Sequence, residues 1–306
     1  MLKYRAISFP LLMALLGVIF FSQKEVSVCV FVFCATAAIG LAAYECARMV
    51  DSGLVHCFPK TAGVLAAAGV FSILAGLTVR KLMHYKMFND YRLGIYIYLL
   101  SVIVSLLIVI VLALLPWMTA VFGNAEKAKK GFATVAVVLM TAIPFGMVAM
   151  LYFKNPKYLF FVMLVTKAMD TGGYIFGMLS NKLMPGGNHK LCPSISPKKS
   201  WEGFAGGVLL AVVTAWALWA IFRACDLSYY PTQENLGKIL VFAVLLALAS
   251  ICGDLTESAL KRKCGVKDSG NLIPGMGGPL DVLDSFIYVG PVCLIHEIIY
   301  TLIIKA

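Results

Sequence analysis

Long apolar runs separated by short polar segments dominate the chain from one end to the other. Crossing about 30 Å of hydrocarbon takes roughly 20 residues of helix. Nine runs approach or reach that length, and they cover residues 6–21, 26–44, 61–79, 93–117, 132–153, 158–179, 204–224, 239–253 and 283–304. The eighth run is short, but its helix is expected to continue through Thr256 to Lys263, outside the lipid. The pattern predicts an all-α integral membrane protein with about nine transmembrane helices, forming a single domain over residues 1–306.

Composition supports lipid as the solvent. Of 306 residues, 61% are hydrophobic and 13% are charged, whereas soluble domains carry about 25% charged residues. The net charge is +11, but no basic face with interleaved aromatic residues indicates a nucleic-acid partner. The nine cysteines are scattered and include no CxxC pair, which argues against a disulfide framework or a zinc site.

The loops predict an orientation. One alternating set of loops, which includes the N-terminus, carries more Lys and Arg than the opposite set, so we expect that set to be cytoplasmic. Two spans separate the polar segment 180–203 from the polar segment 254–284, so both should lie on the same face. The absence of a recognisable transit peptide or added soluble domain favours a multi-pass protein of a bacterial-type inner membrane.

Ionisable residues inside apolar spans are costly and often mark a site. Glu45 and Arg48 lie one helical turn apart, as do Lys167 and Asp170, and His296 and Glu297 are adjacent in the last span. For each of these pairs, a structural ion pair and a functional role are both open.

The segment 253–285 combines acids, bases and glycines at regular spacing. In a helix, Asp254, Ser258 and Lys261 share one face with Glu257. Such carboxylates suit Mg²⁺. The neighbouring cations Lys261, Arg262 and Lys267 suit phosphate oxygens, and glycines such as Gly270, Gly277 and Gly278 allow backbone to approach a ligand. The alternative is an ordinary solvated charged loop.

A second polar segment, residues 189–203, carries hydroxyl groups, two adjacent lysines and the start of the next helix. Ser196, Lys198 and Lys199 belong to it. Hydroxyls, cations and a helix N-terminus together form a plausible anion site, although lysines and prolines in a loop are by themselves ordinary.

Taken together, the two segments resemble the phosphatidate cytidylyltransferases, the CDP-diacylglycerol synthases. The family signature is matched in register by Ser258, Lys261, Arg262, Lys267, Asp268, Pro274, Gly275, Gly277, Gly278, Asp281 and Asp284. Upstream elements also match: residues 170–174, 195–203 and 253–258, and the early Glu45-Cys46-Ala47-Arg48. Two positions depart from the signature, because Met276 stands where the family usually has His and Val282 stands where it usually has Arg.

The resemblance implies transfer of a cytidylyl group from CTP to phosphatidate, with the signature and catalytic region within residues 165–285. It implies Mg²⁺ held by Asp254, Asp281 and Asp284, and leaves a second cation open. Lys267, Asp268 and Asp254 are the implied catalytic residues, with Asp268 as a partner of metal or lysine rather than a proton acceptor. The implied substrate-binding residues are Asp170, Ser196, Lys198, Lys199, Ser258, Lys261, Arg262, Gly277 and Gly278. The implied partners are CTP, phosphatidate and membrane lipids, and a homodimer is an open alternative.

Two rival functions are compatible with the same residues. A CTP-dependent polyprenol or phytol kinase would need a base for a neutral alcohol, and Asp268 or Asp170 would be the candidate. A transporter or non-catalytic protein on the same scaffold would fit the intramembrane Lys167–Asp170 pair and the two departures. The long signature favours the cytidylyltransferase.

Overall fold

The computed structural model describes residues 14–20, 24–84, 99–101, 103–105, 107–108, 110–111, 114, 125–225, 235–273 and 277–300. These residues include seven helices that are long and apolar enough to cross a membrane. The prediction of an all-α membrane protein is therefore confirmed. The predicted spans 6–21 and 93–117 lie largely outside the described residues, so the count of nine helices stays approximate.

The chain divides into two compact units. Unit 1 comprises Met1–Gly146 and Lys263–Leu283, and unit 2 comprises Met147–Arg262 and Asp284–Ala306. The prediction of a single domain over residues 1–306 stays a prediction. Each unit has a buried glutamate, which is Glu45 in unit 1 and Glu257 in unit 2.

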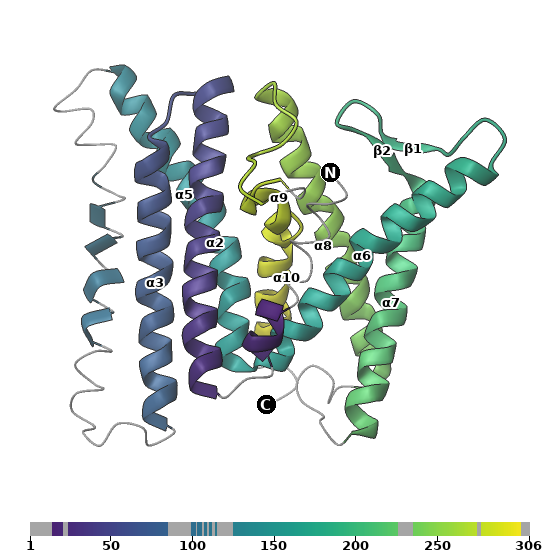
Figure 1. Cartoon of the computed structure of the whole chain (residues 1–306), viewed down its shortest axis with the longest axis horizontal. Coiled ribbons are helices and arrows are strands. Elements are labelled where there is room, and N and C mark those ends of the chain that lie inside the picture. Colours follow the sequence, from purple (N-terminus) through teal and green to yellow (C-terminus); the bar gives the residue numbers. More distant parts are fainter. Residues whose placement is uncertain are drawn as a thin grey trace. The chain divides into compact units, whose positions relative to one another are not determined.

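Unit 1 is built around α2 (Lys24–Gly53) and α3 (Pro59–His84), which run side by side (Figure 1). Small residues let these helices approach closely, because a Cβ added at Gly40 would lie 2.7 Å from Cβ of Ala67. The first part of α5 (Ala125–Lys154) belongs to this unit, as does the short helix α9 (Pro279–Leu283). The segment 264–278, which precedes α9, carries much of the predicted signature.

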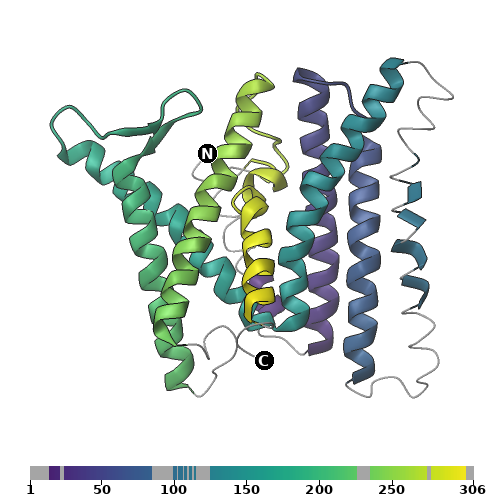
Figure 2. The ribbon, with the colours of Figure 1, turned by 180° about the vertical axis from the view of Figure 1, so that it is seen from behind.

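Unit 2 contains α6 (Pro156–Leu183), α7 (Trp201–Ala224), α8 (Leu236–Lys263) and α10 (Phe286–Ile299) (Figure 2). Asn155 caps α6 by accepting a hydrogen bond from the backbone N–H of Lys157, and Pro156 begins the helix. The expected continuation of the eighth helix to Lys263 is confirmed by α8.

Glycines bring α6 and α7 into close contact. A Cβ at Gly172 of α6 would lie 2.8 Å from the carbonyl oxygen of Gly206, and a Cβ at Gly203 of α7 would lie 2.7 Å from that of Gly173. The helices therefore pack backbone to backbone, as small residues permit in membrane proteins. This contact fixes the part of α6 that directly follows Asp170 against the start of α7.

The polar segment 189–203 was expected to be a loop, but it forms a β-hairpin. β1 (Lys190–Cys192) and β2 (Ser196–Ser200) are antiparallel, with Lys190 opposite Ser200 and Cys192 opposite Ser196. The strands are short and polar, and two prolines interrupt the segment, so the sequence shows no alternating apolar pattern. The hairpin continues directly into α7 (Figure 1).

Candidate functional site

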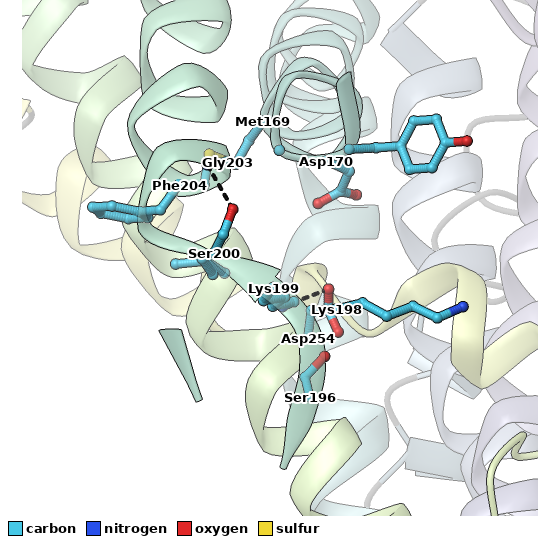
Figure 3. Close-up of a pocket in the computed structure, with 12 residues that line it drawn as sticks. Met169, Asp170, Ser196, Lys198, Lys199, Ser200, Gly203, Phe204 and Asp254 are labelled. Carbon is cyan, nitrogen blue, oxygen red and sulfur yellow. Dashed lines mark hydrogen bonds and ion pairs between the residues drawn. The ribbon is translucent and has the colours of Figure 1, made fainter. Parts of the chain in front are cut away.

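A pocket of about 270 Å³ lies within unit 2, between α6, the hairpin, the start of α7 and α8 (Figure 3). Both polar and apolar side chains line it. Among them are Asp170, Tyr174, Ser196, Lys198, Lys199 and Asp254. The pocket thus gathers five residues predicted as a site from three separate parts of the chain, which are α6, the hairpin and α8.

The Lys199–Asp254 ion pair joins the hairpin to α8. Nζ of Lys199 lies 2.7 Å from Oδ2 of Asp254, and the Ser258 hydroxyl donates to Oδ1 of Asp254 at 3.2 Å. Both carboxylate oxygens of Asp254 are therefore engaged. Figure 3 shows this pair on one side of the pocket and Asp170 on the other, while the Lys198 side chain extends away from the pair.

Hydrogen bonds at its base hold the hairpin in place. Ser200 caps α7 by accepting from the backbone N–H of Gly203 at 3.0 Å, and the N–H of Trp201 donates to the carbonyl of His189. At the tip of the hairpin, Nε of Arg262 donates to the carbonyl of Ile195 at 3.3 Å. The end of α8 and the hairpin therefore lie together, as the prediction of a shared face requires for these residues.

Asp170 is surrounded by donors. Its Oδ2 lies 3.0 Å from Nζ of Lys167 and accepts from the Ser285 hydroxyl at 3.0 Å, while its Oδ1 accepts from the Ser250 hydroxyl at 3.1 Å. The predicted pairing of Lys167 with Asp170 is confirmed. Such charge-assisted hydrogen bonds fix the position of the carboxylate.

Asp284 shares a serine with Asp170. Its Oδ1 lies 2.5 Å from the backbone nitrogen of Ser285 and 3.0 Å from Oγ of Ser285. Asp170, Asp254 and Lys167 are among the charged groups close enough to act on it electrostatically. A hydroxyl has one proton, so Ser285 can donate to Asp170 or to Asp284 but satisfies only one at a time.

These oxygens are chemically suited to a hard cation. Among the described residues, no three His, Cys, Asp or Glu side chains form a ready ligand set. Mg²⁺, however, is commonly bound by only one or two carboxylates together with substrate phosphates and water. The carboxylates of Asp254 and Asp284 therefore fit Mg²⁺ when a phosphorylated substrate supplies further oxygens.

The predicted phosphate-binding cations at the end of α8 already have protein partners. Lys261 forms an ion pair with Glu257, which is only 2% exposed, and Arg262 bonds to the hairpin. Lys261 neutralises a buried carboxylate that would otherwise be costly. In unit 2, Lys198 and Lys199 are the predicted cations that line the pocket.

In unit 1, the predicted metal ligand Asp281 is bound by the segment that precedes it. Asp281 accepts from the hydroxyl of Ser269 at 2.9 Å and from the backbone N–H of Gly278 at 2.7 Å. Gly277 has a φ of 91°, which favours glycine. Lys267 and Asp268 are exposed. Met276 lies outside the described residues, and the N–H of Val282 donates back to the carbonyl of Gly278.

Sequence reasoning missed two serines that bind the intramembrane carboxylates. Ser250 and Ser285 are both buried, at 0% and 1% exposure. A hydroxyl inside the apolar run 239–253, and another directly after Asp284, were the available signals. In contrast, Glu297 in the last span forms an ion pair with Lys154 and the ring of His296 stacks on Phe242 at 3.8 Å, which favours a structural role for both.

Comparison with known proteins identifies one family. Phosphatidate cytidylyltransferases of Staphylococcus epidermidis and Staphylococcus haemolyticus are each 35% identical to the chain over 170 residues, and that of Staphylococcus aureus is 36% identical over 170 residues. The similar region covers 54% of this chain and 60% of each relative. The cytidylyltransferase family matches residues 3–299. The chain therefore belongs to the cytidylyltransferase family.

Proposed function

We propose that this protein transfers the cytidylyl group of CTP to phosphatidate, forming CDP-diacylglycerol and pyrophosphate. The observation that carries the proposal is the pocket in which Lys199 of the hairpin meets Asp254 of α8, beside Asp170. The named activity of the relatives supports the choice of substrates. We also propose that the pocket faces the cytoplasm of a bacterial inner membrane.

The chemistry requires charge neutralisation more than proton transfer. An oxygen of the phosphatidate phosphate forms a bond to the α-phosphorus of CTP. The bond from that phosphorus to the oxygen bridging the α and β phosphates breaks, and pyrophosphate leaves with the electron pair. The nucleophile is an anion at neutral pH, so it needs no general base. Because both reactants are anionic, fixed cations should lower the barrier.

In this proposal, the residues of unit 2 have separate tasks. Lys198 and Lys199 bind phosphate oxygens, and Ser196 donates a hydrogen bond. Asp254 and Asp284 would hold Mg²⁺, which would neutralise phosphate charge when bound. Asp170, held by Lys167, Ser250 and Ser285, fixes the carboxylate side of the pocket.

Other predicted roles stay predictions from the sequence. These are the roles of Asp281 as a further metal ligand, of Lys267 and Asp268 in catalysis, and of Gly277 and Gly278 in binding phosphate. The binding of a second cation and the formation of a homodimer are likewise predictions.

The lipid kinase is less well supported. That reaction needs a base for a neutral hydroxyl. Asp170 is the candidate base in the pocket, but both of its carboxylate oxygens already accept hydrogen bonds.

The test is to incubate purified protein with phosphatidate, Mg²⁺ and CTP labelled at the α or the γ phosphate. We expect α label in the lipid fraction and γ label in pyrophosphate. Entry of γ label into the lipid, with an alcohol acceptor present, would support the kinase instead. Absence of transfer from either position would support a non-catalytic protein.

Sidedness can be tested with a single reactive cysteine at Ser194, in the turn of the hairpin. Native Cys57 and Cys264 can stay in the background, since both are buried. Burial raises the pKa of both thiols, to about 11 for Cys57, where the nearby Asp51 carboxylate adds to the effect, and thiols react with maleimides as thiolates. With the other seven cysteines replaced, we expect labelling at position 194 only from the cytoplasmic side. Labelling from the outside alone would reverse the proposed orientation.

A further inference from the structure

Glu45 is a buried carboxylate near the end of α2 that none of the proposed catalytic steps uses. It is 6% exposed. Its Oε2 accepts from the backbone N–H of Leu280 at 3.1 Å and from the hydroxyl of Ser269 at 3.3 Å. Burying a carboxylate is costly unless donors compensate it. Here the donors come from the segment that precedes and begins α9, more than 220 positions away in the chain.

Two glycines let that segment close around the carboxylate. A Cβ added at Gly270 or at Gly278 would overlap the carboxylate oxygens of Glu45. Any side chain at either position would push the segment away from α2. The backbone therefore approaches Glu45 from two sides, at a distance that only glycine permits.

Asp281 of α9 accepts hydrogen bonds from the same segment. It accepts from the N–H of Ser269 at 3.2 Å, from the hydroxyl of Ser269 at 2.9 Å and from the N–H of Gly278 at 2.7 Å. Ser269 and Gly278 are thus tied together by Asp281, and Ser269 also contacts Glu45. Ser269 on one side of the segment and Gly278 and Leu280 on the other are thus held by two carboxylates, one from α2 and one from α9.

We propose that Glu45 is a positioning residue for cytidylyl transfer, which clamps the segment 269–280 to α2. The segment follows Lys267 and Asp268 directly and leads directly into Asp281, so the clamp sets the backbone next to all three side chains. Glu45 acts through this backbone and touches no reacting atom. The inference rests on the proposed function for its effect on activity, but the clamp itself does not.

The test compares Glu45→Gln and Glu45→Asp with Glu25→Gln, an acid-to-amide control in the first turn of the same helix. Gln keeps the size but loses the charge and one acceptor oxygen, and Asp is one methylene too short. Trypsin cleavage after the exposed Lys267, in protein embedded in membranes, reports whether the segment is released. Turnover of CTP with phosphatidate reports positioning.

For both Glu45 variants we expect cleavage after Lys267 to accelerate by about tenfold or more, and kcat to fall by roughly 10- to 100-fold, the range for one lost hydrogen bond to a charged group. KM for CTP should change by less than about threefold, since Glu45 does not bind substrate. Glu25→Gln should match wild type in both measurements.

Wild-type cleavage and wild-type kcat in Glu45→Gln would overturn the inference. So would a loss of activity that merely follows the folded fraction, with no change in cleavage per folded molecule. Should the Glu45 variants fail to fold, Ser269→Ala removes one donor from the clamp and should accelerate cleavage in the same direction, and unchanged cleavage in that variant would also overturn the inference. If wild type transfers no cytidylyl group while Glu45→Gln still releases the segment, the proposed function fails and the clamp stands.

Discussion

A serine hydroxyl lies between two carboxylates in each of the two units. In unit 1, Ser269 lies between Glu45 and Asp281, and backbone N–H groups supply the remaining donors. In unit 2, Ser285 lies between Asp170 and Asp284. The donors to Asp170 are side chains, and Asp284 also accepts from the backbone N–H of Ser285. Both pairs join an acid from a long helix with an acid of the segment 281–284, but backbone donors predominate in unit 1 and side-chain donors in unit 2.

That difference separates two ways of using a pair of acids. Backbone donors cannot leave without unfolding the segment that bears them, so the pair in unit 1 is suited to hold a loop. Side-chain donors such as Lys167 and Ser285 can change partners by rotating, so the pair in unit 2 is suited to a site that exchanges ligands. Asp170 of the second pair lines the pocket that Lys198 and Lys199 also line.

The largest effect should come from the acids of unit 2. We expect Asp254→Asn and Asp284→Asn to fold but to lose activity by several orders of magnitude, at least the roughly 10²–10³-fold seen when one charge-stabilising group is removed. An amide would no longer hold a cation, so the Mg²⁺ concentration for half-maximal turnover should rise. Turnover and Mg²⁺ titration measure both effects. Glu126→Gln, which alters an exposed ion pair with Lys130, is the control. Near-normal turnover in either Asn variant would refute the metal assignment.

A somewhat smaller effect is expected from Lys199→Met. The variant removes a proposed phosphate-binding cation and also leaves Asp254 without its ion-pair partner. We expect kcat/KM for CTP to fall by roughly 10²-fold, with an increased KM. Lys182→Met, which removes an exposed cation from the end of α6, should leave kinetics unchanged. Equal losses in both variants would indicate a general effect of surface charge instead.

The two serines test the comparison directly. Removing a hydrogen bond to a charged group costs about 1.5–3 kcal/mol. We expect Ser285→Ala to lower kcat by about tenfold or more, without releasing the segment 269–280 and so without faster trypsin cleavage after Lys267. Ser269→Ala should release that segment while lowering kcat by a smaller factor. The same pattern of kinetics and proteolysis in both variants would show that the two carboxylate pairs are not used differently.

The smallest effect concerns the two departures from the family signature. Lys261, Arg262, Lys263 and Lys267 already supply positive charge near residues 276 and 282 in the sequence. We therefore expect Met276→His with Val282→Arg to change kcat/KM by less than about tenfold, or 1.4 kcal/mol. An inert wild type that gains strong activity in the double variant would show instead that the site has degenerated.

Much of the architecture could be predicted from hydrophobicity because lipid imposes a minimum length on each span. The continuation of α8 to Lys263 and the Lys167–Asp170 pair followed from helical spacing. The hairpin could not be predicted from the sequence pattern, because its strands are held by pairing with each other rather than by an apolar face. Ser250 and Ser285 were missed for a related reason. A serine in an apolar helix often bonds to its own backbone, and only the tertiary structure shows that these two face carboxylates.

The site residues also divide into those that the sequence could group together and those whose partners only the structure shows. Residues of the two polar segments could be brought together by a family pattern, and the structure places Ser196, Lys198, Lys199, Asp170 and Asp254 around one pocket. The sequence could not show that Lys261 neutralises Glu257 or that Gly278 donates to Asp281. Such internal partners depend on side-chain distances, which one-dimensional spacing does not specify.

The ion pair between Lys199 and Asp254 has a thermodynamic consequence. While the two side chains hold each other at 2.7 Å, neither is fully available to a ligand. An anion that draws Lys199 away leaves the Asp254 carboxylate in need of a new cation, and a cation taken up by Asp254 leaves Lys199 in need of a new anion. Reciprocity of binding free energies requires each ligand to strengthen the other by the same factor. A single pair of side chains would thereby make occupancy of the pocket by oppositely charged ligands cooperative.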